Sequence, residues 1–371
     1  MARDIVKTLK SCCGAVFTVL LITSCGGGGG GGDDGASAAT PAMPYTEFFV
    51  AMPAQAVYPA DNPFSDAKET LGELLFWDPI LSGDADVACA SCHHPDHAWA
   101  DGRELSIGVG GEGLGPDREG VAETPRHSPS VLNMAFAGID NRPIDPAFVS
   151  GPYFWDLRAE TLEDQALEPI LSRVEMRGEL FSEAEIIPEV LSRLQANADY
   201  VLLFEQAFGA GDVVTANNIA LALATYQRGL ITPRTRFDDF LNGDETALSD
   251  REITGLNKFI NAGCVDCHSG PMLSDFAIDA SRPVIRGLPA VRTPSLRNVA
   301  LTAPYMHNGS RPTLNSALGL YDDRDDLDLQ FDDDDDAGDV AAFLRVLSTP
   351  DFARDIPLTV PSNLPVGGDI D

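Results

Sequence analysis

Two copies of one five-residue signature constrain this chain more than any other feature of its sequence. The order cysteine, two intervening residues, cysteine, histidine occurs at 89–93 and again at 264–268. This pattern is typical of c-type haem attachment, because two thiols can form thioethers with the haem vinyl groups while the adjacent histidine binds the iron. The sequence therefore predicts two haem c groups. The residues expected to hold them are Cys89, Cys92, His93, Cys264, Cys267 and His268.

Two other kinds of site also use paired cysteines. A zinc ribbon usually places its pairs about 15 to 20 residues apart and needs no histidine directly behind either pair. A thioredoxin-like redox motif would account for one pair, but it leaves the second pair and both histidines unexplained. The wide spacing and the two histidines therefore favour haem.

The N-terminus is typical of an export signal. Basic residues precede an apolar run at 15–22 that is too short to span a bilayer. Residues 21–25 read Leu-Ile-Thr-Ser-Cys and resemble a bacterial lipoprotein box. We therefore expect a signal peptide over 1–25 and lipidation of Cys25, which would anchor the protein in the periplasm to a membrane. An ordinary secretory signal cleaved nearby is the alternative.

A flexible tether is expected at 26–43, because its seven consecutive glycines and small polar residues offer little apolar surface. Helical patterns then lead to each haem motif. Residues 66–76 carry spaced leucines before Cys89, and a capping box at Ser249 opens an apolar face that leads to Cys264. Strand signals are scarce.

These patterns predict an all-α fold of two cytochrome c-like domains, each with one covalently bound haem. The first domain is expected over 44–228 and the second over 229–371. Further helices are expected after the capping box at Ser182, at 217–226 and at 337–347.

The chain is strongly acidic, with a formal net charge of -32 at pH 7. Such a surface repels nucleic acid and anionic lipid, and it favours encounters with cationic proteins such as small basic cytochromes. Contact with a membrane is therefore expected through the lipid anchor alone.

Several sequence blocks resemble the bacterial di-haem cytochrome c peroxidases and their MauG-like relatives. The resemblance runs from about Asp66 to the C-terminal helix, and its blocks keep the family's order and spacing. They lie at 75–78, 89–93, 126–129, 154–156, 174–176, 264–268, 292–298 and 303–307.

The resemblance implies a role for each matching residue. His93 would be the proximal ligand of a haem that reduces peroxide, and His268 that of a haem that transfers electrons to it. Trp155 would lie between the two haems. Gln165 and Glu175 would form the distal pair of the peroxidatic haem, with Glu175 as the acid/base that moves the peroxide proton.

Two departures from the family pattern change what is expected of the haems. Where many members have a histidine in the loop that follows the first motif, this chain has Val109, which cannot bind iron. The first haem is therefore expected to be open and high-spin without reductive activation. The sixth ligand of the second haem, often a methionine, appears at Tyr321, as in MauG-type enzymes, with Met306 as the rival.

The family's inter-domain calcium is a further expectation that this chain weakens. An asparagine often contributes to that site together with backbone oxygens near Thr302 and Pro304. Here His127 takes the place of the asparagine, and imidazole is a poor calcium ligand. Calcium is therefore possible by family resemblance but disfavoured by this residue.

The resulting functional hypothesis is a di-haem c-type peroxidase that reduces hydrogen peroxide with electrons from a small cytochrome c or a copper protein. One alternative is a MauG-like oxidase that uses peroxide to modify Tyr or Trp residues of a partner protein. The other is an electron-transfer cytochrome without enzymatic activity. Formation of a homodimer is left open.

Overall fold

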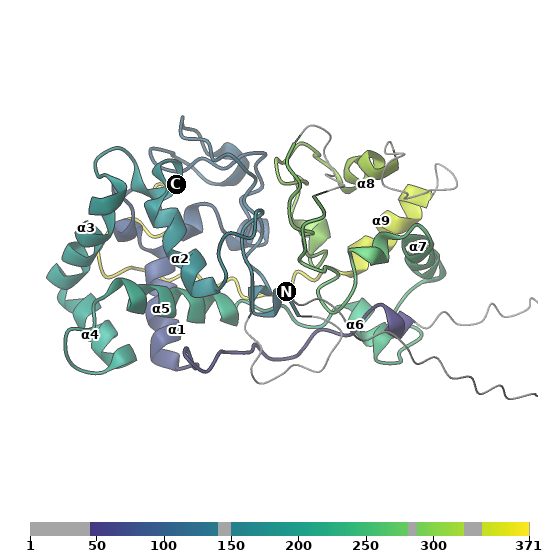
Figure 1. Cartoon of the computed structure of the whole chain (residues 1–371), viewed down its shortest axis with the longest axis horizontal. Helices are drawn as coiled ribbons and strands as arrows, with labels where there is room; N and C mark the ends of the chain where they lie inside the picture. The colour runs from purple at the N-terminus through teal and green to yellow at the C-terminus, as the bar shows by residue number, and fades with distance from the viewer. Residues whose placement is uncertain (1–44, 140–149, 281–287, 323–335, 371) are drawn as a thin grey trace, which may run out of the picture. The chain divides into compact units, whose positions relative to one another are not determined.

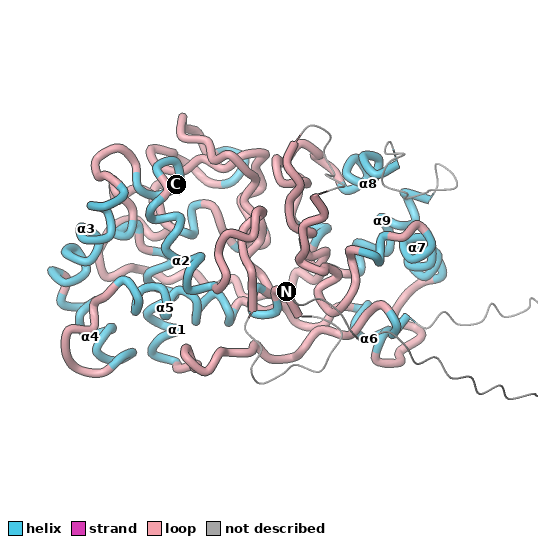
Figure 2. Tube along the Cα trace, in the orientation of Figure 1, coloured by secondary structure: helices cyan, strands magenta, loops and turns pink. Residues whose placement is uncertain are grey.

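Helices form all the regular secondary structure in the residues described. The computed structural model describes residues 45–139, 150–280, 288–322 and 336–370. Within these ranges the chain forms helices, short turns and isolated bridges, and Figure 2 shows no strand in them. The predicted all-α class is confirmed. The predicted signal peptide, the lipidated Cys25 and the tether at 26–43 lie outside the described residues.

The N-terminal helix group comprises five helices on either side of the first motif (Figure 1). They are α1 (Asp66–Trp77), α2 (Leu162–Leu171), α3 (Glu183–Ala196), α4 (Ala198–Phe208) and α5 (Ala216–Gly229). Helix α5 packs against α1 and α2, and α1 also packs against α4. Leu71, Phe76 and Leu223 are buried between them in one apolar cluster, the first cluster.

The C-terminal helix group surrounds the second motif (Figure 1). It comprises α6 (Arg236–Leu241), α7 (Asp250–Asn261), α8 (Leu314–Asp322) and α9 (Asp336–Val346). Helix α9 packs against α7 and α8. Leu256, Phe259 and Phe343 are buried in a separate apolar cluster, the second cluster. Among the helices described in either group, none is both long and apolar enough to cross a membrane.

Local capping signals fix where several of these helices begin. Ser182 and Ser249 are the N-caps of α3 and α7. Ser249 and Glu252 form a reciprocal capping box, whereas the Ser182 backbone N–H and hydroxyl both donate to the Glu185 carboxylate. The helices expected from these two signals are therefore confirmed, and those expected at 66–76, 217–226 and 337–347 are present as α1, α5 and α9.

The two helix groups repeat the same close helix crossing. A Cβ on Gly72 of α1 would lie 2.1 Å from the Ala222 carbonyl oxygen of α5, and a Cβ on Gly255 of α7 would lie 1.9 Å from the Asp339 carbonyl oxygen of α9. Only glycine allows two helix backbones to approach this closely. Because α1 and α7 each lead into a haem motif, the internal repeat extends to the packing.

A matching pair of loops continues the repeat beyond the helices. Asn133 and Asn298 both have left-handed backbone angles, with φ of 63° and 60°. The backbone N–H of Asn133 donates a hydrogen bond to the Leu230 carbonyl just after α5. The backbone N–H of Asn298 donates one to the Leu347 carbonyl just after α9. Each motif is thus followed by a loop fixed to the end of its own group's long helix.

Each end of the described chain packs in the apolar cluster of the helix group at the opposite end of the sequence. Phe49, near the start, is buried in the second cluster, whereas Phe352 and Val360, near the end, are buried in the first. Residues 43–371 form one compact unit. The predicted division into 44–228 and 229–371 stays a prediction, and the terminal segments would join the domain opposite to the one their position suggests.

Candidate haem sites

The histidines of the two motifs are held in the same way. His93 Nδ1 lies 3.2 Å from the Trp99 carbonyl oxygen, and His268 Nδ1 lies 3.0 Å from the Leu273 carbonyl oxygen. Burial lowers the pKa of both imidazoles, which favours the neutral form that binds metals. A neutral imidazole that donates Nδ1–H to a carbonyl carries its lone pair on Nε2, the atom that ligates iron.

The cysteines of each motif lie on a tight turn that brings them beside their histidine. The turns are the 3₁₀ segments Cys89–Ser91 and Cys264–Asp266. The His93 amide donates to the Cys89 carbonyl at 3.0 Å, and the His268 amide donates to the Cys264 carbonyl at 2.8 Å. None of the four cysteines forms a disulfide, so all four sulfur atoms can form thioethers.

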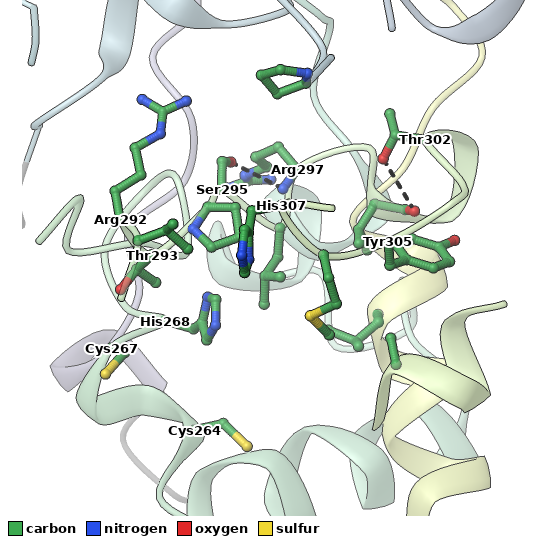
Figure 3. Close-up of a pocket in the computed structure, with 18 of the residues that line it drawn as sticks. Cys264, Cys267, His268, Arg292, Thr293, Ser295, Arg297, Thr302, Tyr305 and His307 are labelled. Atoms are coloured by element: carbon green, nitrogen blue, oxygen red, sulfur yellow. Dashed lines mark hydrogen bonds between the residues drawn. The ribbon is translucent and has the colours of Figure 1, made fainter. Parts of the chain in front are cut away.

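A cavity of about 270 Å³ adjoins the second motif (Figure 3). Cys264, Cys267 and His268 line it together with Tyr321 and Met306. Its apolar lining and its attachment groups fit a haem, which would be held through these cysteines and this histidine. Both of the residues predicted as rival sixth ligands therefore border the same cavity.

The environment of Tyr321 opposes its ionisation in the absence of iron. Burial, followed by the charges of the Cys264 and Cys267 thiols, raises the pKa of the Tyr321 phenol. Conversion of the cysteines to thioethers removes the second cause, and coordination to ferric iron would supply the positive charge that a phenolate needs.

Glu175 lies on a π-helical turn, Arg173–Arg177, that directly follows α2. The carboxylate contributes to raising the pKa of the thiols of Cys89 and Cys92, which both reach about 12 mainly through burial. Its charge is thus within electrostatic reach of the first motif. Burial also raises the pKa of Glu175 itself, while Arg158 lowers it and Glu168 raises it further.

The loop that carries Val109 packs directly on this turn. A Cβ on Gly108 would lie 2.0 Å from the Val174 carbonyl oxygen and 2.5 Å from that of Glu175, so the two backbones are in contact there. The buried Arg118 fixes the same loop, because its guanidinium donates hydrogen bonds to the carbonyls of Ile107, Gly108 and Gly113. Val109 is half-buried against the first cluster.

Gln165 lies in the first turn of α2, just after the N-cap Thr161, and is half-buried. Helix α2 packs against the π-helical turn, so the structure places Gln165 and Glu175 on adjoining elements. The cap is firmly built, since the Thr161 hydroxyl accepts the Asp164 amide proton and the Asp164 carboxylate accepts the Thr161 amide proton.

Trp155 takes part in a pair of equivalent hydrogen bonds that connect the two halves of the repeat. Its indole N–H donates to the His127 carbonyl at 2.9 Å, and its ring lies 6.2 Å from the His307 ring in an edge-to-face arrangement. The His127 amide donates to the His307 carbonyl, and the Arg292 amide donates to the Trp155 carbonyl, both at 2.9 Å. Trp155 and His307 also line the cavity at the second motif.

Sequence reasoning gave no role to Asp101, which is buried near the first motif. Its carboxylate raises the pKa of His93, Cys92 and His127 against the effect of burial on the two histidines. One carboxylate oxygen, Oδ2, has no hydrogen-bond partner among the described atoms. No periodic or motif signal marks this residue, since it follows the motif in an irregular loop.

A helical fold that places a histidine and two cysteines at each of two equivalent turns defines a di-haem c-type cytochrome. Residues 66–246 match the family model described as di-haem cytochrome c peroxidase. A methylamine utilization protein MauG from Methylorubrum extorquens is 33% identical over 285 residues, covering 72% of this chain and 72% of that protein. A cytochrome c551 peroxidase from Pseudomonas aeruginosa is 32% identical over 332 residues, covering 84% of this chain and 87% of that protein.

A similar structure extends the likeness to three dimensions. The crystal structure of a MauG-like protein associated with microbial copper homeostasis superposes with a TM-score of 0.65 at 28% identity, covering 80% of this chain and 93% of that one. The chain belongs to the di-haem cytochrome c peroxidase family. The resemblance inferred from the sequence blocks is thereby confirmed.

Proposed function

We propose that this chain is a peroxidase that reduces hydrogen peroxide at the haem of the first motif, with electrons relayed through the haem of the second. The observation that carries the proposal is the position of Glu175. A half-buried carboxyl with a raised pKa acts electrostatically on Cys89 and Cys92, and close packing against Gly108 supports it. A bound haem would supply the iron that binds peroxide and exchanges electrons.

The contribution of the protein is to move the proton. Cleavage of the O–O bond requires a group that accepts the proton of the attached oxygen and delivers it to the departing one. Glu175 can do both, because burial brings its pKa closer to neutral pH than that of an exposed glutamate. The carboxamide of Gln165, on the adjoining α2, would hold the peroxide by hydrogen bonding.

The direct test is Glu175→Gln, which keeps the size of the side chain and removes its capacity to accept a proton. We expect both haems to remain attached and peroxide turnover to fall by about 10²-fold or more. Haem content by pyridine haemochrome and the rate of peroxide-dependent donor oxidation are the measurements. Glu179→Gln, at an exposed site on the following loop, is the matched control. Full turnover by Glu175→Gln would reject the assigned role.

The pH profile gives the same test without a change of side chain. Glu175 must be ionised to take the first proton, so kcat/KM should decrease as the pH falls through its pKa. Because burial raises that pKa, the decrease should begin at a higher pH than the ordinary value of glutamate, about 4.3, would give.

The packing of the Val109 loop supports an open first haem. Valine has no atom that can ligate iron, and Arg118 together with the Gly108 contact holds the loop against the Glu175 turn. A histidine that blocks the iron is therefore absent from this loop, and no reductive activation step is expected. Trp155, with its indole fixed to the His127 carbonyl, would conduct electrons between the haems.

A MauG-like oxidase that modifies Tyr or Trp residues of a partner protein is the second candidate. The presence of Tyr321 in the cavity at the second motif favours it, because a phenolate ligand stabilises ferric iron. Steady oxidation of a reduced small cytochrome c or copper protein by peroxide would select the peroxidase. Absence of that activity, with modification of a protein substrate, would select the oxidase, and absence of both would leave an electron-transfer cytochrome.

We also propose that the chain functions without the family's calcium ion. The His127 ring is buried and its Nδ1 lies 2.8 Å from the Arg103 carbonyl oxygen, so the imidazole already has a protein partner. Removal of calcium with a chelator should therefore leave turnover and both haem spectra unchanged. Loss of activity that returns with added calcium would contradict this proposal.

The cellular setting that we propose is the periplasm, with attachment to a membrane through lipid on Cys25. The lipoprotein box in the sequence and the compartment in which c-type haems are expected support it. Mass spectrometry of the mature N-terminus would test it, since an unmodified terminus at another residue would indicate an ordinary secretory signal.

A further inference from the structure

Arg292 brings a buried positive charge to the cavity at the second motif, and its guanidinium carbon lies 5.8 Å from the centroid of the Phe276 ring. Its side chain is 5% exposed and lines that cavity. Of the five N–H donors of a guanidinium, one lies 3.5 Å from the Pro152 carbonyl oxygen, at the limit of a hydrogen bond, and Nε has no partner. Among the described residues no carboxylate forms an ion pair with Arg292. Among them, Tyr153 is the one group whose charge acts on the pKa of Arg292, and it raises that pKa.

The charge of each other buried arginine in the described ranges has hydrogen-bond acceptors in the protein, although Nε of Arg228 has no partner. The Arg297 guanidinium pairs with both Asp238 oxygens, at 2.8 and 2.9 Å. Arg228 pairs with Glu163 in the same two-pronged way. Arg118 donates to backbone carbonyls instead. Arg292 has neither a carboxylate nor a set of carbonyls, so its environment is built for an acceptor that the polypeptide does not supply.

The charge of Arg292 persists in this environment. Burial lowers the pKa of Arg292 to about 10, which still leaves the guanidinium protonated at neutral pH. The contact with the Phe276 ring offsets the cost of burying this cation only in part, whereas a carboxylate that accepts two parallel N–H bonds would stabilise it further. The free N–H donors of Arg292 therefore suit an oxyanion, such as a carboxylate, that accepts two of them.

The chemistry of haem places such an anion here. The cysteines attach the vinyl edge of the ring, and the two propionate carboxylates project from the opposite edge. In Figure 3, Cys264 and Cys267 lie in the lower part of the view, and the Arg292 side chain extends upward from its loop, away from both cysteines and beyond His268. We propose that Arg292 binds a propionate of the second haem, an inference that rests on haem attachment at this motif.

The repeat places a different side chain at the equivalent position near the first motif. Arg292 occupies the position in the second loop that His127 occupies in the first, and the two amides make equivalent bonds to the His307 and Trp155 carbonyls. The side chains differ, because the His127 ring is bonded to the Arg103 carbonyl and is not a permanent cation. The fixed charge of Arg292 thus favours the reduced state of the second haem and aids entry of an electron there.

The test is a redox titration of the haem-loaded full chain. Arg292→Gln removes the charge, Arg292→Lys retains it, and Arg345→Gln removes one from an exposed position on α9. For Arg292→Gln the equilibrium constant for reduction of the second haem should fall on the order of tenfold. For Arg292→Lys the fall should be less than about threefold, and Arg345→Gln should match the unsubstituted protein.

An unchanged potential in Arg292→Gln would overturn the proposal. A potential in the unsubstituted protein that falls with added acetate would also overturn it, because it would show that Arg292 is open to an exchangeable anion. If Arg292→Gln does not fold, resonance Raman spectra of the unsubstituted protein and Arg292→Lys decide. One propionate bending band of the second haem should shift between them, and identical bands would contradict the pairing. Failure of the peroxidase proposal would appear separately, as absent turnover with both potentials as expected.

Discussion

At the scale of single residues, the two haem motifs differ in what surrounds them and not in how they attach haem. The bonds from His93 and His268 to backbone carbonyls are equivalent. Glu175 lies near the first motif alone, whereas Tyr321 and Arg292 line the cavity of the second. The proposed division between a peroxide-reducing haem and an electron-transfer haem depends on these three side chains.

Tyr321 gives a prediction at this scale. Tyr321→Phe removes the phenol oxygen and should convert the second haem from low-spin to high-spin or to a new ligand set, with a visible change in the ferric absorption and electron paramagnetic resonance spectra. Met306→Leu, in the same cavity, is the matched control and should leave both spectra unchanged. A spectrum altered by Met306→Leu and not by Tyr321→Phe would assign the ligand to the methionine.

Sequence reasoning reached the residues whose chemistry is local and missed those that depend on the fold. A Cys-x-x-Cys-His motif contains its whole attachment site in five residues, so both motifs could be recognised directly. Arg292 was part of a family block without a role, and Asp101 carried no signal. The unpartnered atoms of both side chains become evident only when distant loops bury them.

At the scale of elements, helices with strong caps and clear apolar periodicity were predictable. Ser249 begins α7 because its hydroxyl and Glu252 satisfy the first amide groups reciprocally. The π-helical turn Arg173–Arg177 could not be predicted, because it depends on the end of α2 at Ser172, whose carbonyl accepts the amides of Glu175, Met176 and Arg177. Helices α2, α4, α6 and α8 were not predicted from the sequence either.

Helix α6 contributes Asp238 to a buried ion pair with Arg297, and this pair gives a stability prediction. Asp238 accepts hydrogen bonds from the Arg297 guanidinium and from the amides of Met52 and Thr235. Asp238→Asn would leave the Arg297 charge buried and unpaired, so the free energy of unfolding should fall by about 3–5 kcal/mol. Denaturant unfolding is the measurement. The exposed neighbour Asp239→Asn should change it by less than about 0.5 kcal/mol.

The pair of Asp238 and Arg297 also determines whether the free energy of unfolding rises or falls with pH. Burial alone would raise the pKa of Asp238, but Arg297 and the amide donors outweigh burial and hold it below the ordinary value. Its contribution is therefore fully present above the unfolded pKa of about 3.9 and is lost as the pH falls through the lower folded value. An Asp238→Asn variant as stable as the unsubstituted protein would show that the pair contributes nothing net.

At the scale of the whole molecule, the chain is a duplicated unit whose two copies have diverged. The glycine-mediated helix crossings and the left-handed asparagines recur in both halves. The reciprocal amide bonds of His127 and Arg292 recur as well. Sequence patterns indicated the repeat only through the haem motifs and the helices before them. The exchange of the terminal segments between the apolar clusters could not be foreseen, because it depends on long-range packing.

The absorption and electron paramagnetic resonance spectra of the isolated ferric protein test the central claim most directly. An open first haem beside Val109 and a second haem closed by Tyr321 predict one high-spin signal and one low-spin signal without the absorption of a methionine ligand. Two low-spin haems before any reduction would contradict the open first site and, with it, the proposed division of roles between the haems.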